Sequence, residues 1–224
     1  MSDHPVATTT HLRGDLSVDQ RVALKTAATR LQTEFADMFG VQSIERFLHS
    51  SYDQFAGRAT IPNFLPLLAE RFARQRLRAL AKVEGKSSDG KPIVLFLCTH
   101  NAGRSQMAMG FFTQLAGDAA VAWSGGSEPG DEVNPAAVQA MAEVGIDISG
   151  EYPKPWTDEI VQAADVVITM GCGDACPVFP GRRYEEWVLD DPAGQDVEGV
   201  RPIRDNIEER VRRLLTDLGV AINA

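Results

Sequence analysis

Cysteine is scarce in this sequence: Cys98, Cys172 and Cys176 are the only three among 224 residues. A small extracellular fold held by disulfides needs several cysteine pairs, and this chain has neither the pairs nor the small size. We therefore expect the three thiols to be reduced at rest, and to be either catalytic or inert.

Long apolar runs and a surplus of basic residues are also missing. No stretch approaches the roughly 20 apolar residues of a membrane helix, and the first sixteen residues lack the apolar core of a signal peptide. Lysine and arginine number 22 against 31 aspartates and glutamates, which gives a net charge of −9. That balance favours solubility and argues against non-specific binding of nucleic acid. We expect a cytoplasmic protein whose partners include neither a membrane nor a nucleic acid.

The stretch from Lys91 to Ser105, KPIVLFLCTHNAGRS, organises the rest of the chain. Its five-residue apolar run, 93–97, is typical of a buried central strand. Beyond this stretch the apolar residues fall at helical spacing, namely Ala108, Phe111, Phe112 and Leu115. The expected order is therefore strand, tight loop and helix, with Cys98 where the strand ends and Arg104 where the helix begins.

Such a loop can bind an oxyanion. Its backbone N–H groups can turn inward, and the helix N-terminus adds positive potential. The planar guanidinium of Arg104 matches a tetrahedral oxyanion, and the same field favours the nucleophilic thiolate of Cys98. The expected oxyanion-binding residues are Thr99, His100, Asn101, Ala102, Gly103, Arg104 and Ser105. The alternative is a buried structural cysteine beside an ordinary surface arginine, because a Cys-x5-Arg pattern arises often by chance.

Residues 17–82 predict a small all-α bundle of three amphipathic helices, preceded by a loose tail at 1–16. Ser17 and Gln20 form the pattern of a capping box at the start of the first helix. The other expected limits are Gly40 for its end, Ser43 and Gly57 for the second helix, and Pro62 for the start of the third. Glycine, serine and charged residues at 83–91 indicate a linker.

The third helix carries four arginines, Arg71, Arg74, Arg76 and Arg78. They form either an electrostatic patch for an acidic partner or a solvated helix face, and the solvated face is the commoner outcome for a run of charges. No chemistry is expected in the bundle, which holds one histidine and no cysteine. Its role stays open between packing on the catalytic part, a homodimer contact and recruitment of a partner.

Residues 92–224 alternate strands and helices, which predicts an α/β domain with a four-stranded, parallel, doubly wound sheet. The expected strands are 93–97, 120–124, 165–170 and 186–189, the second being cut off by Gly125 and Gly126. The expected helices begin after Asn134, after Thr157 and near Val200, and the last one ends at Gly219. Ligands of such sheets bind at the carboxyl ends of strands, where Cys98 lies.

Two further motifs follow strands of this sheet. Cys172 and Cys176 stand four apart in a glycine-containing loop, so they can meet if the loop bends. As alternatives they are inert, or they join Cys98 and His100 in a metal site. Their spacing is not a common zinc pattern, so we expect no metal. Asp191 precedes a proline, and that pair alone is an ordinary turn signal.

The motif Cys98-x5-Arg104-Ser105 resembles the phosphate loop of low-molecular-weight tyrosine phosphatases. The longer stretch 97–108 is similar to the arsenate reductase branch of that superfamily. The resemblance covers Pro92 to about Gly219 and leaves out the N-terminal part. It implies that Cys98 is the nucleophile, that Ser105 steadies its thiolate, and that Asp191 is the general acid.

The resemblance also implies a reaction. Cys172 and Cys176 match, in order, the second and third cysteines of the thioredoxin-coupled members, with a shorter gap between them. The Cys98 thiolate attacks arsenate, and Cys172 then releases arsenite by forming a disulfide with Cys98. Cys176 passes this disulfide to a Cys172–Cys176 pair, which thioredoxin reduces as the electron donor. No bound cofactor is implied.

Three other interpretations stay open. A low-molecular-weight phosphatase acting through a phosphocysteine accounts for the loop, but it gives two cysteines no role and lacks the aromatic residue that follows Asp-Pro in many phosphatases. An arsenate reductase that uses a low-molecular-weight thiol and a glutaredoxin-like partner does not need those cysteines either. A module that only binds an oxyanion makes no use of Asp191. Two positions depart from the family: His100 replaces a common glycine, and Met109 replaces a potassium-binding glutamate of some relatives, so no potassium site is expected.

Overall fold

The computed structural model describes residues 16–57, 64–87, 90–171 and 178–223. The chain divides into two compact units, residues 1–74 and 75–224. The division falls inside one helix, α3 (Leu65–Val83), whose C-terminal part belongs to the second unit. The domain limits and the linker expected from the sequence stay predictions. Within the described ranges, no helix combines the length and the apolar character that crossing a membrane requires.

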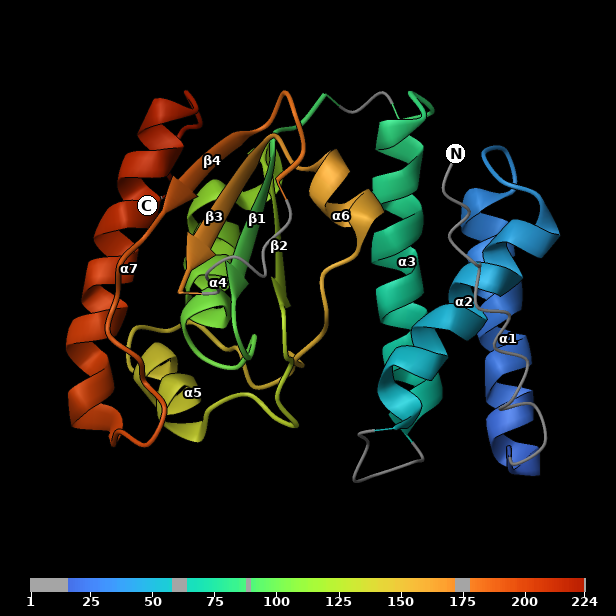
Figure 1. Cartoon of the computed structure of the whole chain (residues 1–224), viewed down its shortest axis with the longest axis horizontal. Helices are drawn as coiled ribbons and strands as arrows, with labels where there is room; N and C mark the ends of the chain where they lie inside the picture. The colour runs from blue at the N-terminus through green and yellow to red at the C-terminus, as the bar shows by residue number, and fades with distance from the viewer. Residues whose placement is uncertain (1–15, 58–63, 88–89, 172–177, 224) are drawn as a thin grey trace, which may run out of the picture. The chain divides into compact units, whose positions relative to one another are not determined.

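The first unit is a helical bundle made of α1 (Val18–Phe35), α2 (Val41–Ala56) and the first part of α3 (Figure 1). The predicted capping box is confirmed: Ser17 Oγ accepts the Gln20 N–H at 3.1 Å, and Gln20 Oε1 accepts the Ser17 N–H at 3.0 Å. The predicted limits between the first two helices are wrong. The first helix stops before Gly40, which is instead the N-cap of α2 in extended backbone geometry.

Glu70 of α3 is a buried carboxylate in this bundle, and two arginines neutralise it. Arg30 donates through Nε to Glu70 Oε1 at 2.9 Å, and Arg74 donates through Nη2 to the same oxygen at 2.8 Å. The hydrogen bond from Arg30 is the main cause that holds the pKa of Glu70 below its usual value of 4.5, against the opposing effect of burial. The ionised form therefore stabilises the fold above pH 4.5, and this contribution is lost as the pH falls through the lower pKa of the folded state.

Glu70→Gln is expected to lower the free energy of unfolding at neutral pH by about 1–2 kcal/mol, because both guanidinium groups lose a charged acceptor. The difference from the wild type should shrink below pH 4.5, where Glu70 of the unfolded chain is protonated. Urea unfolding followed by circular dichroism, at neutral pH and again well below pH 4.5, measures both effects. The control is Glu34→Gln, which removes the charge from a more exposed partner of Arg74 and should lower the free energy of unfolding by less. A stability loss in Glu70→Gln that is the same at both pH values contradicts the ion-pair explanation.

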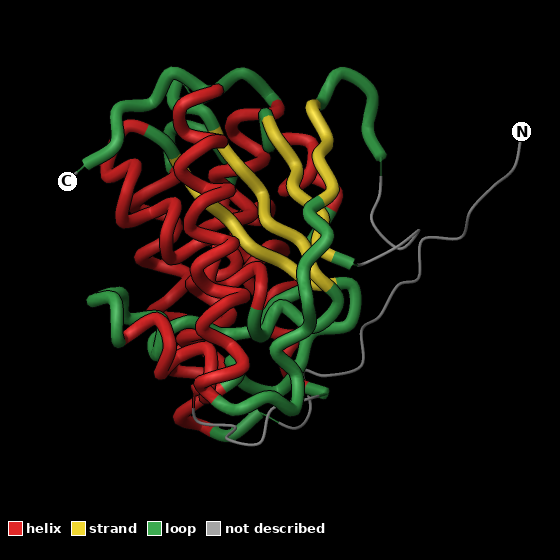
Figure 2. The backbone as a smooth tube through the Cα atoms, turned by 90° about the vertical axis from the view of Figure 1, so that its left-hand side faces the viewer, coloured by secondary structure: helices red, strands yellow, loops and turns green. Residues whose placement is uncertain are grey.

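The second unit contains a four-stranded sheet in the order β2-β1-β3-β4. Its strands are β1 (Ile93–Cys98), β2 (Val121–Gly126), β3 (Val166–Met170) and β4 (Arg183–Glu186). All three strand pairs are parallel, and Figure 2 shows the strands side by side. The prediction of an α/β fold with a four-stranded parallel sheet is confirmed.

Two strand limits differ from the prediction. β2 continues through Gly125 and Gly126, because both residues pair in register with the end of β1. β4 lies at 183–186 rather than 186–189, because this edge strand is polar and largely exposed, which hides it from a search for apolar runs. Trp187, an apolar residue on which the predicted range 186–189 was based, is buried directly after the strand.

Helices cover both faces of the sheet, as a doubly wound fold requires (Figure 1). α4 (Arg104–Ala116), α5 (Pro135–Ala142) and α7 (Val197–Asp217) share one hydrophobic core with alternate residues of β1 and β3. The short α6 (Asp158–Ala163) packs against β1 on the opposite face. A 3-10 turn, η2 (Gly117–Ala119), connects α4 to β2. Cys98, the last residue of β1, belongs to the core beneath α4.

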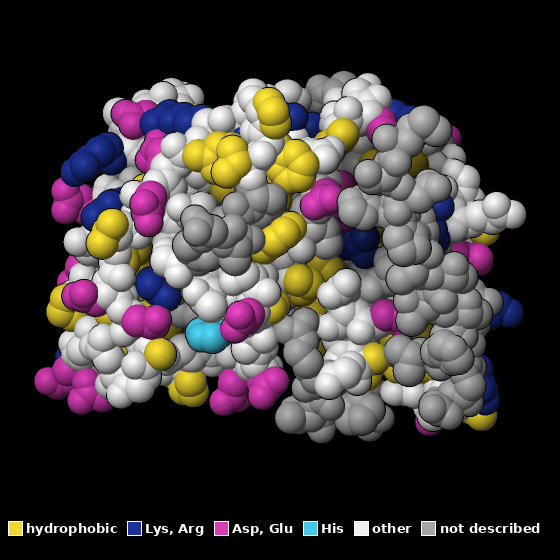
Figure 3. Space-filling view, viewed as in Figure 1, with side chains coloured by type: hydrophobic (Ala, Val, Ile, Leu, Met, Phe, Trp, Pro, Cys, Tyr) yellow, Lys and Arg dark blue, Asp and Glu magenta, His cyan; other side chains and the backbone are white. Residues whose placement is uncertain are grey.

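Charges of both signs are mixed on the surface. On the face drawn in Figure 3, basic and acidic side chains are interspersed. Two arginines of α3 form ion pairs within their own units: Arg74 Nε lies 2.6 Å from Glu34 Oε2, and Arg76 Nε lies 2.5 Å from Glu159 Oε1. These two arginines are partly exposed and engaged by carboxylates of the same chain, and the choice between a solvated face and a patch for an acidic partner stays a prediction.

Candidate active site

Cys98 lies at the point where β1 ends and the loop to α4 begins, as the sequence predicts. The side chain is 3% exposed, and its sulfur is a free thiol. Cys98 Sγ accepts the backbone N–H of Asn101 at 3.2 Å and lies 2.9 Å from Ser105 Oγ. The loop therefore wraps around the sulfur and offers it hydrogen-bond donors.

Asn101 decides the direction of these hydrogen bonds. Its Nδ2 donates to Ser105 Oγ at 2.9 Å, so the Ser105 hydroxyl proton is left for Cys98 Sγ. Two donors then stabilise negative charge on the sulfur. Asn101 also adopts φ 48°, the only positive φ outside glycine in the described part of the chain. The departure from glycine at His100 thus causes no backbone strain, because the left-handed residue is the asparagine that follows, a residue type that tolerates it.

Two buried residues that sequence reasoning missed support the loop from within the protein. The backbone N–H of Lys154 donates to Asn101 Oδ1 at 3.0 Å, and its Nζ donates to Ser124 Oγ at 3.2 Å. Gln106 Nε2 donates to the carbonyl oxygens of Asn101 at 2.9 Å and Tyr152 at 3.2 Å. The lysine stands between two prolines in an irregular segment, where the sequence gives no periodic signal of burial. Its contact with the loop is made by the backbone, whereas its Nζ also lies 3.9 Å from Glu151 Oε2.

Arg104, the first residue of α4, faces the loop after β4. Its Nη2 donates to Asp191 Oδ2 at 2.9 Å, and the side chain is 10% exposed while that of Asp191 is 53% exposed. The guanidinium also lies against Gly171, where an added Cβ would stand 3.1 Å from Nη1. Thr99 Oγ1 donates to the carbonyl oxygen of the same glycine at 3.0 Å. The ends of β1 and β3 and the Asp191 loop therefore meet at one guanidinium.

All predicted site residues within the described part of the chain lie together at the carboxyl ends of β1 and β3. These are Cys98, Thr99, His100, Asn101, Ala102, Gly103, Arg104, Ser105 and Asp191. Cys172 and Cys176 lie outside the described residues. Their relay with Cys98 stays a prediction, and so does the alternative metal site. Gly171, the residue before Cys172 in the sequence, lies at the site beside Arg104.

Comparison with known proteins supports this geometry. The family model described as low molecular weight phosphotyrosine protein phosphatase matches residues 93–223. A second model, described as protein-tyrosine-phosphatase-like, N-terminal domain, matches residues 24–81. A solved thioredoxin-dependent arsenate reductase of Corynebacterium glutamicum is similar over 88% of this chain and 96% of its own, with 41% identity and a TM-score of 0.79.

Relatives that lack the helical bundle match the α/β unit. Arsenate reductase 1 of Staphylococcus epidermidis is 42% identical over 125 residues, which cover 54% of this chain and 93% of the relative. A putative arsenate reductase of Halobacterium salinarum is 37% identical over 130 residues, which cover 56% of this chain and 92% of the relative. The chain therefore belongs to the low molecular weight phosphotyrosine protein phosphatase family, in the branch whose members are named arsenate reductases.

Proposed function

We propose that this protein reduces arsenate to arsenite and that thioredoxin restores it. The observation that carries the proposal is the position of the Cys98 sulfur, which accepts one backbone hydrogen bond and lies beside the Ser105 hydroxyl, in the loop that ends at Arg104. The relatives named arsenate reductases, one of them thioredoxin-dependent, support the choice of substrate and electron donor.

The first step forms a bond between sulfur and arsenic. Loop N–H groups and the Arg104 guanidinium bind the oxygens of arsenate, which is a tetrahedral oxyanion. The Cys98 thiolate attacks arsenic, and one arsenic–oxygen bond breaks. Asp191, whose side chain contacts Arg104 at 2.9 Å, acts in its protonated form: it gives its proton to a hydroxyl of arsenate, and this oxygen leaves as water.

The second step moves two electrons. The Cys172 thiolate attacks Cys98 Sγ, so a disulfide forms, the sulfur–arsenic bond breaks, and arsenic leaves as arsenite with the electron pair. Cys176 then attacks Cys172 and frees Cys98. The remaining Cys172–Cys176 disulfide is reduced by the dithiol of thioredoxin. The order of the cysteines in the sequence and the thioredoxin-dependent relative support this relay.

The family also supports a second candidate function, hydrolysis of phosphomonoesters through a phosphocysteine at Cys98. Arg104 and Asp191 serve such a reaction equally well. The residues after Asp191-Pro192 are Ala193 and Gly194, so no aromatic ring is offered there to a phosphotyrosine. This difference favours arsenate reduction over phosphatase activity as the proposed function.

Substitution of Cys172 and substitution of Cys176 are expected to block different steps of the reaction. With arsenate, NADPH, thioredoxin and thioredoxin reductase, Cys172→Ser and Cys176→Ser should each lose sustained NADPH consumption. In a rapid-quench experiment without thioredoxin, Cys176→Ser should still release about one arsenite per protein, whereas Cys172→Ser should release none, because only Cys172 attacks Cys98.

The same assay discriminates among the alternatives. Sustained turnover by the Cys172→Ser/Cys176→Ser double variant, in the presence of glutathione or another small thiol, points to an external thiol and contradicts the internal relay. Rapid hydrolysis of an aryl phosphate that the double variant retains in full favours the phosphatase. NADPH consumption that does not depend on arsenate contradicts the proposed function altogether.

A further inference from the structure

Asn134 connects three segments that surround the candidate active site. Its backbone N–H donates to the carbonyl oxygen of Ala102, in the oxyanion loop, at 2.8 Å. Its Oδ1 caps α5 by accepting the N–H groups of Ala136 at 2.8 Å and Ala137 at 3.2 Å. Its Nδ2 donates to the carbonyl oxygen of Pro192 at 3.1 Å. The last of these bonds is not needed to cap a helix, so it calls for another explanation.

Pro192 helps to set the position of Asp191, whose carboxylate also accepts the Ala193 N–H at 3.0 Å and Arg104 Nη2 at 2.9 Å. It is buried, although Asp191 before it is exposed. Its ring lies against Gly103, where an added Cβ would stand 2.5 Å from Pro192 Cγ. The carbonyl oxygen of Pro192 accepts N–H groups from Asn134 and from Gln195, so it is held from both sides. Since the proline ring restricts φ, fixing this residue restricts where the preceding carboxylate points.

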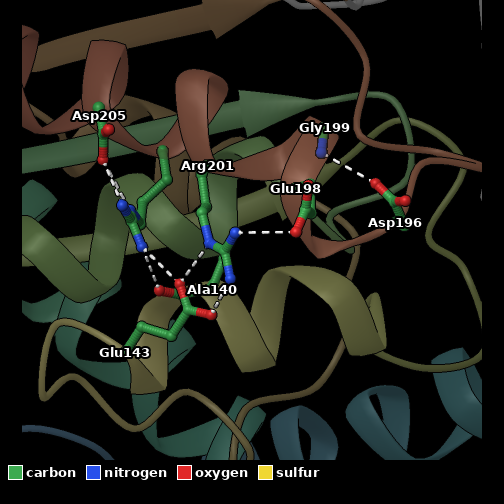
Figure 4. A network of polar contacts seen from close by, with 8 residues as sticks. Ala140, Glu143, Asp196, Glu198, Gly199, Arg201 and Asp205 are labelled. Atoms are coloured by element: carbon green, nitrogen blue, oxygen red, sulfur yellow. Dashed lines mark hydrogen bonds and ion pairs between the residues drawn. The ribbon is translucent and has the colours of Figure 1, made fainter.

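The helix that carries this bond is itself anchored at its other end. Arg204 of α7, 8% exposed, donates to the Ala140 carbonyl oxygen at 2.8 Å and to Glu143 Oε2 at 3.2 Å. Arg201 donates to both oxygens of Glu143 at 2.8 Å, and Figure 4 shows the Arg201 guanidinium facing the Glu143 carboxylate. The hydrogen bond from Arg201 is the main cause that holds the pKa of Glu143 below its usual value, so the carboxylate stays ionised at neutral pH. α5 is therefore a fixed support for the Asp191 loop.

We propose that Asn134 is a positioning residue for the reaction: its side-chain N–H holds the loop at Pro192, so that Asp191 stays over the oxyanion loop beside Arg104. The inference rests on the proposed function in one respect, the assignment of Asp191 as the acid. Loss of the Asn134–Pro192 bond lets the loop move away from Gly103 and lowers the rate of the step in which the leaving oxygen is protonated. Binding of arsenate is unaffected, because the backbone bond from Asn134 to Ala102 does not involve the side chain.

The test separates this bond from the helix cap. Asn134→Asp keeps an acceptor for the first N–H groups of α5 and favours the helix N-terminus, but it has no N–H for Pro192. Asn134→Ser also caps the helix, carries no charge, and has a side chain too short to reach Pro192. At saturating arsenate, both variants should lower the rate of the first arsenite release, measured by rapid quench, by about 10-fold or more. The half-saturating arsenate concentration and the melting temperature should stay near the wild-type values.

Combination with Asp191→Ala shows through which group Asn134 acts. Asp191→Ala should lower the rate by itself, and Asn134→Ser should then have no further effect, because the positioned group is gone. Two results overturn the positioning role and leave Asp191 as the acid. One is a double variant whose rate loss equals the product of the two single losses, and the other is a normal rate for Asn134→Ser alone. An unchanged rate for Asp191→Ala overturns the acid assignment and the positioning role together.

Discussion

Cys98→Ser is expected to abolish arsenate reduction, with a fall in kcat of about 10⁴-fold or more, as for the loss of other enzymatic nucleophiles. The serine oxygen is a far weaker nucleophile than a thiolate at neutral pH, and it can form neither the sulfur–arsenic bond nor the disulfide that releases arsenite. The substitution replaces one buried atom by a smaller one. Asn101 and Ser105 can keep their hydrogen bonds around it, so the fold should persist.

A measurement of arsenate binding to Cys98→Ser shows whether the variant is inactive because the nucleophile is missing or because the binding site is disrupted. Since Arg104 and the loop N–H groups are intact in Cys98→Ser, isothermal titration should show that arsenate still binds to the folded protein. NADPH-coupled turnover and arsenite release should both be absent. Residual turnover above the rate of a protein-free control contradicts the assignment of Cys98 as the nucleophile. Loss of binding together with activity indicates instead that the thiol has a structural role.

Arg104→Lys is the second change with a large expected effect. It keeps one positive charge but removes the planar group that donates to Asp191 and can hold two oxygens of an oxyanion at once. We expect kcat/KM for arsenate to fall by about 10³-fold, in the range that one preorganised donor contributes to a charged transition state. A lysine ammonium cannot occupy the space beside Gly171 and reach Asp191 in the same geometry.

The Cys98→Ser background makes the binding part of this effect measurable without turnover. Arsenate titrated into Cys98→Ser and into Cys98→Ser/Arg104→Lys gives the loss in affinity, and the remainder of the fall in kcat/KM belongs to the chemical step. Arg104→Ala is the matched variant that removes the charge as well, and it should lose more affinity than Arg104→Lys. A kcat/KM within about threefold of the wild type for Arg104→Lys contradicts the role of the planar guanidinium.

Local sequence patterns were sufficient to predict the order of strand, loop and helix around Cys98 and Arg104. The buried strand, the loop from Cys98 to Arg104 and the amphipathic α4 lie next to one another in the sequence, so periodicity and capping rules describe them directly. The capping box at Ser17 and the N-cap at Asn134 were also predictable for the same reason, since each involves residues three positions apart or fewer. The parallel direction of the strands was predicted from the alternation of strands and helices.

Contacts between segments far apart in the sequence could not be predicted from local patterns. The burial of Lys154 depends on Ser124 and Asn101, which belong to a different strand and a different loop. The bond from Asn134 to Pro192 joins residues 58 positions apart, and no spacing rule points to it. β4 was misplaced because an exposed edge strand does not need the apolar pattern that identifies a buried one.

The position of Trp187 gives the protein a built-in optical probe. All three tryptophans, Trp123, Trp156 and Trp187, occur after residue 75, so tryptophan fluorescence, excited selectively at the red edge of the absorption band, reports on the second unit alone. Trp187 is buried against Phe96 with the Arg210 guanidinium 5.9 Å from its ring, and it stands four residues before Asp191. A displacement of the Asp191 loop would change the surroundings of this indole, so emission from the unlabelled protein can follow that displacement in real time.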